Sequence, residues 1–419
     1  MLFMSLTRQK KQKSLYSFFS YRLALLLVCM PFFTNAAIAN KDFTQCMTNL
    51  KGLAETKGFS PYITTTIIDN ISPIAQVIAL DKKQPEFTES FQQYIKARVT
   101  SHHIKTGKQK LIKHKKLFDQ LEEKYGVPRQ FLVSFWGLET YFGKHKGKMS
   151  VLNSLATLAC DQRRSEFFTS ELFDLFTLIE EKTVSVEQLK GSWAGAMGHL
   201  QFMPSALLKY AIDGDNDGKV DIWHSEVDAL TTAANYLNKI GWQAKERWGR
   251  EVLLPKNFAF ELVAFDQYYP LSSFQQLGVK KTNNSTLAND SIEAEIYLPS
   301  GYQGPAFLLY PNFNVIMTWN RSKSYALSVG ILADKLQGEN NLLFLNNKQV
   351  NKRPYSIIEL KNLQRQLNSL GYETGKPDGL WGPKSRHAIR LFQLKLGLIA
   401  DGYPNNQVFL TVKLMIKKD

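Results

Sequence analysis

The sequence of 419 residues predicts a mainly helical α+β protein that contains two folded domains. Apolar side chains recur at the i, i+3/i+4 spacing of helices over most of residues 40–340. Strand-like runs occur near residues 251–264 and 293–317. A polar linker at 341–354 then separates a smaller helical unit at 355–419. A chain of this length also exceeds the usual size of a single domain.

The N-terminus has the composition of an export signal. Residues 1–39 combine basic side chains with the apolar run LALLLVCMPFF, and Ala37 and Ala39 supply small residues at the cleavage positions. The run is too short for a confident membrane span. Cys29 follows Val28, where a lipoprotein signal would need a smaller residue. We therefore expect export to the periplasm without a lipid anchor.

Export leaves two cysteines in the mature chain, Cys46 and Cys160. An oxidising compartment favours a disulfide between them, which would tie the start of the mature chain to a segment that follows the glutamate-bearing helix described below. The alternative is two unrelated buried thiols.

The chain is basic, with a formal net charge of +15. Removal of residues 1–39 lowers this charge to about +10, because that segment contains no acids and five bases: Arg8, Lys10, Lys11, Lys13 and Arg22. Lys, Arg and His also recur through residues 96–116, but no nucleic-acid-binding motif accompanies them. We interpret this segment as a solvated helix face with a general attraction for anionic polymers.

A helix is predicted between Pro128, which can open it, and Gly143, which can close it. One apolar stripe runs along it: Leu132, Phe135, Trp136 and Phe142. Glu139 lies on the same stripe, where burial would raise its pKa and let it donate a proton near neutral pH. On spacing alone, a buried glutamate paired with an arginine is an equally good interpretation.

A glycine-rich segment follows at 191–198. Gly191, Gly195 and Gly198 lie too close together for a stable helix and would let the main chain pass close to a ligand. Pro204 then starts a new helix. A glycine-rich wall beside a desolvated acid predicts a groove for a polymer. His199 lies in this segment and is expected to make an ordinary hydrogen bond, and the seven histidines show no spacing typical of a zinc site.

The C-terminal unit has the pattern of a small helical bundle. Its first helix carries an apolar stripe: Ile357, Leu360, Leu363, Leu367 and Leu370. Gly371 ends that helix, Asp378-Gly379 marks a turn, and Pro383 begins a second helix. Asp401-Gly402 repeats the turn.

Two strings, ETYFG at 139–143 and GAMGHLQFMPS at 195–205, resemble those of the family B lytic murein transglycosylases. The resemblance extends to LDKKQPEF at 80–87, SLATLACDQRR at 154–164, DGDNDGKVDIW at 213–223, DALTTAANYL at 228–237 and WNRSKSYALSV at 319–329. Residues 355–419 resemble the three-helix peptidoglycan-binding domain of wall enzymes. Their closing part, YPNNQVFLTVK, lacks the glycine expected there.

This resemblance implies a lysozyme-like catalytic domain that cleaves the bond between N-acetylmuramic acid and N-acetylglucosamine. Glu139 would act as acid and then as base, leaving a 1,6-anhydro end, with no cofactor required. Two alternatives remain open, a lysozyme-type hydrolase and a noncatalytic peptidoglycan-binding protein. The expected partner is the glycan strand and not nucleic acid, the expected state is a monomer, and complexes with other wall enzymes are left open.

The resemblance also implies a set of substrate-binding residues. The matching positions are Ser192, Gln201, Tyr236, Asn320, Tyr325, Arg163 and Arg164. Trp319 would stack on a sugar face. The two arginines would hold peptide or lactyl carboxylates. The alternative of a surface or supporting role has more weight for them than for Gln201 and Ser192.

A calcium site is also implied, because members of the family have one in this loop. Three acids fall at positions 1, 3 and 5 of an EF-hand-like loop: Asp213, Asp215 and Asp217. Position 12 is His224, a poor calcium ligand, so Glu226 or Asp228 would have to close the site. The alternative is a capping box in which Ser225 and Asp228 begin a helix.

Overall fold

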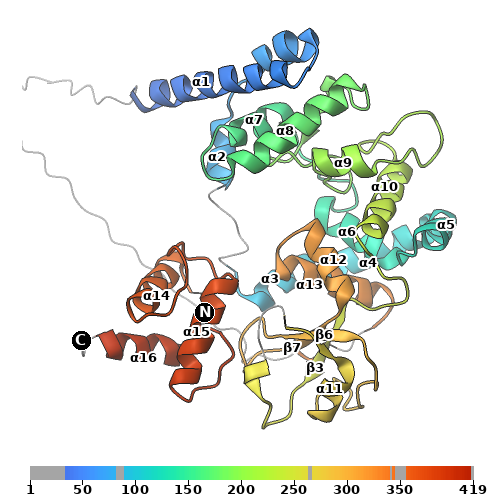
Figure 1. Cartoon of the computed structure of the whole chain (residues 1–419). Coiled ribbons are helices and arrows are strands. Elements are labelled where there is room, and N and C mark those ends of the chain that lie inside the picture. Colours follow the sequence, from blue (N-terminus) through green and yellow to red (C-terminus); the bar gives the residue numbers. More distant parts are fainter. Residues whose placement is uncertain (1–33, 82–88, 263–266, 340–341, 345–354, 417–419) are drawn as a thin grey trace, which may run out of the picture.

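The computed structural model describes residues 34–81, 89–262, 267–339, 342–344 and 355–416 (Figure 1). The proposed signal therefore lies outside the described residues except for 34–39, which begin the first helix, and most of the proposed linker also lies outside them. Helices dominate the chain, and the prediction of a mainly helical α+β protein is confirmed.

The larger part of the chain is a helical domain with one short π-helix. Its helices are α1 (Thr34–Thr56), η1 (Tyr62–Ile67), α2 (Ala75–Asp81), α3 (Phe91–Arg98), α4 (Ser101–Lys113), α5 (Lys115–Tyr125), α6 (Arg129–Thr140), α7 (Val151–Ala159), α8 (Ser165–Glu180), α9 (Pro204–Tyr210), α10 (Glu226–Lys239), α12 (Pro311–Trp319) and α13 (Lys323–Leu336). Three-residue helical turns lie at Ile68–Asn70, Val186–Gln188 and Phe260–Leu262. A two-stranded ribbon joins β1 (Met149–Ser150) to β2 (Lys190–Gly191).

A five-stranded antiparallel sheet inserts between α10 and α12, in the strand order β4-β6-β7-β3-β5. Its elements are β3 (Gly249–Leu253), β4 (Tyr269–Pro270), α11 (Leu271–Gln276), β5 (Lys280–Lys281), β6 (Glu293–Tyr297) and β7 (Ala306–Leu309). It has a small apolar core of its own. The predicted strand runs were too long, because β3 ends at Leu253 and Pro311 starts helix α12 within the second run.

Helix α6 is the centre of the main core. Nine of its twelve residues are buried, and it packs against α13, α4, α5 and α10. Close approach depends on small residues in the neighbouring helices. A Cβ atom at Gly107 of α4 would lie 2.7 Å from Leu336 and 3.3 Å from Val133 of α6, and one at Gly330 of α13 would lie 2.2 Å from the Trp248 ring.

The N-terminal helix α1 is joined covalently to this core. The sulfurs of Cys46 in α1 and Cys160, which follows α7, form a disulfide with Cα atoms 5.8 Å apart. Among the described residues, no single helix combines the length and apolar character needed to cross a membrane, whereas one bent pair, Tyr62–Asn70 with Ala75–Asp81, satisfies both criteria.

The C-terminal domain is a three-helix bundle with a separate core. Its helices are α14 (Ile357–Ser369), α15 (Pro383–Lys395) and α16 (Asn406–Ile416). The closing segment forms α16 despite the missing glycine. The core joins all three helices: Leu363, Leu367, Ile389, Phe392, Val408 and Val412.

The two Asp-Gly turns of this domain have matching hydrogen bonds. Gln364 donates to Asp378 and accepts from the Gly379 amide, and Gln393 does the same with Asp401 and Gly402.

We predict opposite effects for the same substitution at two helix glycines. Gly330→Ala should lower the free energy of unfolding by about 1–3 kcal/mol, because the added methyl group would overlap the buried Trp248 ring. Gly52→Ala in α1 should raise it by about 0.5–1 kcal/mol, because a Cβ there meets nothing within 4 Å. Chemical denaturation measures both values, and equal effects would contradict this packing.

Candidate active site

The chain reverses sharply where α6 ends. Tyr141 and Phe142 both have left-handed backbone angles, with φ of 53° and 59°, and Gly143 continues this with a φ of 85°. The helix therefore ends at Thr140, three residues before the predicted stop. Phe142 does not extend the stripe along the helix but folds back over Gly137, where a Cβ atom would lie 2.9 Å from its ring. Non-glycine residues in this conformation cluster at functional sites.

Glu139 lies in the last turn of α6 and is partly exposed. The prediction that Glu139 is buried is therefore wrong in part. The residue is only half-buried, because the last turn of the helix carries its side chain out of the core. Its Oε1 accepts hydrogen bonds from Trp319 Nε1, at 3.1 Å, and from the Tyr325 hydroxyl. An indole and a phenol from α12 and α13 thus orient the carboxylate.

Aromatic rings continue from this carboxylate to α9. The Trp319 ring contacts those of Phe135, Phe202 and Tyr236, with centroids 4.5, 5.5 and 5.1 Å apart. Tyr236 in turn stacks on Tyr210 at 4.7 Å. Burial is the main cause that raises the pKa of the Tyr236 hydroxyl, with smaller contributions from Tyr210 and Glu171. We call Phe202, Tyr210, Tyr236 and Trp319 the aromatic wall.

The glycine-rich segment is braced by the two polar residues singled out from the sequence. Ser192 Oγ accepts from the amides of Ala194 and Ala196, at 3.3 and 3.0 Å. Gln201 has a φ of 53°, and its Nε2 donates to the carbonyl oxygens of Lys146 and Gly198. Both side chains therefore hold the shape of the loop.

The glycines themselves serve close packing within the protein. A Cβ atom at Gly195 would lie 2.3 Å from Leu155, and one at Gly198 would lie 2.5 Å from the carbonyl oxygen of Ile222. Packing inside the protein therefore requires these glycines, and the expectation that they also make room for a ligand stays a prediction.

His199 joins the same loop to α6. Trp136 Nε1 donates to His199 Nδ1 at 3.1 Å, and Thr140 Oγ1 donates to the His199 carbonyl oxygen at 2.6 Å. Burial, assisted by the nearby Lys146 cation, lowers the pKa of the imidazole from 6.5 to about 4. The ring is therefore neutral at physiological pH and accepts the indole hydrogen bond.

The two arginines have a partner within the chain. Arg163 and Arg164 both bind the carboxylate of Asp81, the last residue of α2, which is buried. Burial opposes ionisation of Asp81, but the two guanidinium groups outweigh it and lower the carboxyl pKa. This favours the supporting role for Arg163 and Arg164 over the binding of substrate carboxylates.

The remaining predicted residue, Asn320, shapes the start of α13. Its Oδ1 accepts from the Ser322 amide at 3.1 Å, and Ser322 caps the helix that carries Tyr325. The fold thus brings Glu139, Trp319, Tyr325 and Tyr236 together.

Two residues here were not predicted from the sequence: Tyr210, which belongs to the aromatic wall, and Glu171, whose charge acts on the Tyr236 hydroxyl. Glu171 is buried and accepts from the amide and hydroxyl of Ser205 in α9. Its place in an apolar helical run was the available signal, the same one that singled out Glu139.

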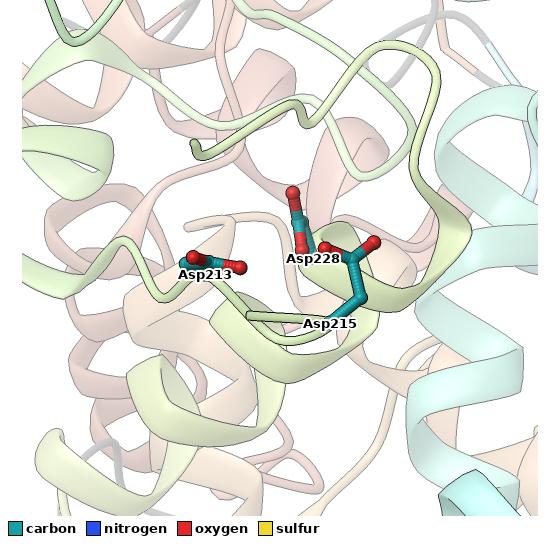
Figure 2. A group of neighbouring side chains, drawn as sticks. All are labelled: Asp213, Asp215 and Asp228. Atoms are coloured by element: carbon teal, nitrogen blue, oxygen red, sulfur yellow. The ribbon is translucent and has the colours of Figure 1, made fainter. Parts of the chain in front are cut away.

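A second carboxylate group lies in the loop before α10. Figure 2 shows Asp213, Asp215 and Asp228 converging, and ligand oxygens of the three lie within 4.8 Å of one another. Asp217 is not among them; its Oδ1 accepts from the Lys219 amide instead. The carboxylate group therefore includes Asp228, one of the two acids expected to close the loop, and leaves out Asp217.

The predicted capping box is only half formed. Ser225 Oγ accepts from the Asp228 amide at 3.1 Å, but the Asp228 carboxylate accepts from the amides of Gly214 and Asp221 in the loop. Burial raises the pKa of Asp228, and the Asp215 charge adds to this. Clustered carboxylate oxygens of this kind are the donors that Ca²⁺ prefers.

These features define a class of protein. A carboxylate oriented by an indole and a phenol beside a wall of aromatic rings suits acid–base cleavage of a sugar polymer. The chain belongs to the family described as the transglycosylase SLT domain, whose model matches residues 42–334. A model described as a putative peptidoglycan-binding domain matches residues 358–410.

Known relatives agree with this assignment. Membrane-bound lytic murein transglycosylase B of Escherichia coli (strain K12) is 30% identical over 270 residues, which cover 63% of this chain and 71% of the relative. SltB3 from Pseudomonas aeruginosa, in complex with NAG-anhNAM-pentapeptide, is 35% identical with a TM-score of 0.82, over 88% of this chain and 99% of that one.

A third relative was solved with calcium bound. Slt35 from Escherichia coli, in complex with calcium, is 27% identical with a TM-score of 0.60, over 71% of this chain and 93% of that one. The resemblance to lytic transglycosylases is thereby confirmed.

His199 should make stability depend on pH in the acidic range. Its pKa is lower in the folded state, about 4, than its ordinary 6.5, so the unfolded chain binds more protons between these values. Stability should be complete above pH 6.5 and fall as pH drops, by roughly 3 kcal/mol at most. Chemical denaturation of the parent and His199→Gln from pH 4 to 7 tests this. A stability difference that does not change with pH would rule it out.

Proposed function

We propose that this protein cleaves the peptidoglycan glycan strand by lytic transglycosylation, with Glu139 as the acid and then the base. The observation that carries the proposal is the pair of hydrogen bonds from Trp319 and Tyr325 to Glu139 Oε1. They hold the carboxyl group at the end of the aromatic wall, which suits the binding of successive sugar rings.

The reaction needs one carboxyl group. Protonated Glu139 donates its proton to the oxygen between C1 of N-acetylmuramic acid and the next N-acetylglucosamine, and that C1–O bond breaks. The carboxylate then takes the proton of the muramic C6 hydroxyl, whose oxygen bonds to C1 and closes the 1,6-anhydro ring. The N-acetyl oxygen of the substrate stabilises the cationic C1 in place of a second carboxylate.

The side chains near Glu139 have supporting roles in this scheme. Trp319 and Tyr236 present ring surfaces to the sugars, and Tyr325 orients the carboxyl group. Ser192 and Gln201 hold the glycine-rich loop opposite the substrate. A lysozyme-type hydrolase is the second candidate, because it would use the same acid but add water. The mass of the product separates the two, since an anhydro end is one water lighter.

The protein is proposed to act in the periplasm. The basic and apolar composition of residues 1–39, the Cys46–Cys160 disulfide and the murein-degrading relatives support export. Residues 40–340 would form the catalytic domain, and residues 355–419 would bind the wall.

Glu139→Gln should reduce the release of muropeptides from purified peptidoglycan by about 10²–10⁴-fold, because the amide cannot deliver a proton. Tyr325→Phe should reduce it by roughly tenfold through loss of one hydrogen bond to the carboxylate. Glu123→Gln, at an exposed position of α5, is the matched control and should retain full activity. Mass spectrometry of the products gives rate and chemistry together. Near-parent activity of Glu139→Gln would assign the acid elsewhere.

Asp213, Asp215 and Asp228 are proposed to hold a structural Ca²⁺ ion. At a calcium concentration of 100 times Kd, binding should stabilise the fold by about 2.7 kcal/mol, read as a rise in Tm. Asp228→Asn should lose this rise. Asp217→Asn should keep it, because Asp217 lies outside the carboxylate group. Equal calcium effects in the two variants would refute the assignment.

A further inference from the structure

Helix α9 carries one end of the aromatic wall and packs against both α8 and α10 (Figure 1). Phe202 lies just before the helix, and Tyr210 is its last residue. The helix has only seven residues, and its N-cap residue, Met203, forms no side-chain capping hydrogen bond. The placement of these two rings therefore depends on the contacts that hold α9 in position.

A buried carboxylate from α8 holds the start of α9. Glu171 has an exposed fraction of only 4%. Its Oε2 accepts from the Ser205 amide at 3.0 Å, and its Oε1 accepts from the Ser205 hydroxyl at 2.7 Å. The first amides of a helix have no partner within the helix, and a side-chain oxygen can satisfy them. Glu171 therefore supplies from a neighbouring helix the cap that Met203 does not provide.

The other end of α9 is held from α10. Asn235 is buried, and its Nδ2 donates to the Tyr210 carbonyl oxygen at 2.9 Å. Asn235 directly precedes Tyr236, whose ring stacks on that of Tyr210. Buried polar side chains of two different helices thus fix both ends of α9, and the stacked pair of tyrosines lies at the second end.

Charge pairing does not account for Glu171. In the part of the chain that the structure describes, it forms no ion pair, and burial is the main cause that raises the pKa of its carboxyl group. Ser205 opposes this effect, whereas the charge of Asp174 adds to it. Burying a carboxyl group without a cation costs free energy, so its two hydrogen bonds to Ser205 are what the site gains from it. Glu171 also lies near enough to Tyr236 for its charge to raise the pKa of that hydroxyl.

We propose that Glu171 is a positioning residue for glycan binding, which fixes α9 so that the Tyr210 ring lies in line with Tyr236 and Trp319 along the bound strand. The proposal rests on the proposed function and extends it, because it adds a residue that touches no sugar to those that set the affinity for the strand. Glu139 is oriented from α12 and α13, so loss of Glu171 should weaken binding and leave bond cleavage nearly unchanged.

Calorimetric titration with a peptide-free octasaccharide of alternating N-acetylglucosamine and N-acetylmuramic acid tests the proposal in the Glu139→Gln background, where cleavage is slow. Glu171→Leu should weaken binding about tenfold, because α9 is no longer preorganised. Glu171→Gln should bind within about twofold of the background protein, since its amide can accept from the Ser205 N–H and donate to the Ser205 Oγ. Ser205→Ala, which removes one of the two bonds, should weaken binding about threefold and replaces Glu171→Leu if that variant does not fold.

Thr157→Val is the control for a general loss of stability. Thr157 of α7 is buried, and its Oγ1 accepts from the Ile74 amide at 2.9 Å, so this variant also removes a buried bond between two segments. It should lower Tm, as Glu171→Leu does, but should keep the affinity for the octasaccharide. Equal losses of affinity in the two variants would overturn the proposal.

A double-mutant cycle tests whether Glu171 acts through the ring of Tyr210. In a Tyr210→Leu background, Glu171→Leu should weaken binding by less than about threefold, because the ring that it positions is absent. Additive losses would overturn the proposal, and so would a loss in Glu171→Gln equal to that in Glu171→Leu, or no binding of the octasaccharide by the background protein.

Kinetics with soluble peptide-free strands complete the test. In the protein with Glu139 intact, Glu171→Leu should raise KM about tenfold and change kcat by less than about twofold. A fall in kcat with unchanged KM would overturn the positioning role. Failure of the parent to cleave any strand would refute the proposed function, but the titration would still decide whether Glu171 sets the affinity for the glycan.

Discussion

The hydrogen bonds that Trp319 and Tyr325 donate to Glu139 are the contacts on which the site depends. They join residues 180 and 186 positions apart in the sequence, so the carboxyl group is oriented only when α12 and α13 are packed against α6. On α13, Gly330 also lets the helix lie against the Trp248 ring, which directly precedes β3.

The other side of the site is held by a different set of contacts with the same helix. His199 accepts from Trp136, its carbonyl oxygen accepts from Thr140, and its ring occupies the space that a side chain at Gly143 would need. Because burial keeps this imidazole neutral, the link between the glycine-rich loop and α6 requires no counter-charge. Tyr141, Phe142 and Gln201, which have left-handed backbone angles, lie where these segments meet.

The C-terminal domain has its own apolar core and is also hydrogen-bonded to the catalytic domain. Its own core lets it fold as a unit, but Asp401 and Arg390 bind main-chain groups of the catalytic domain. The two Asp-Gly turns have the same internal hydrogen bonds, yet Asp401 is buried at the domain contact while Asp378 is exposed. Of the two turns, Asp401-Gly402 is therefore the one that docks against the catalytic domain.

Features that depend on local spacing and on composition could be predicted before the fold was known. Pro128 predicted the start of α6, Pro204 the start of α9, and the stripe at 357–370 the first helix of the C-terminal domain. Helical periodicity, proline and glycine act over a few residues, so they can be interpreted without knowing the fold. The strings that resemble those of lytic transglycosylases are likewise short runs of consecutive residues.

Which groups meet depends on how distant segments pack, and this could not be predicted from the sequence. The tertiary structure exposed Glu139 in part, paired Arg163 and Arg164 with Asp81, and grouped Asp228 but not Asp217 with the other two loop carboxylates. Each of these outcomes depends on contacts between distant segments, or on the direction in which a loop turns its side chains, and neither has a periodic signal in the sequence. Burial, charge pairing and the docking of two domains are properties of packed surfaces, and only the folded chain sets them.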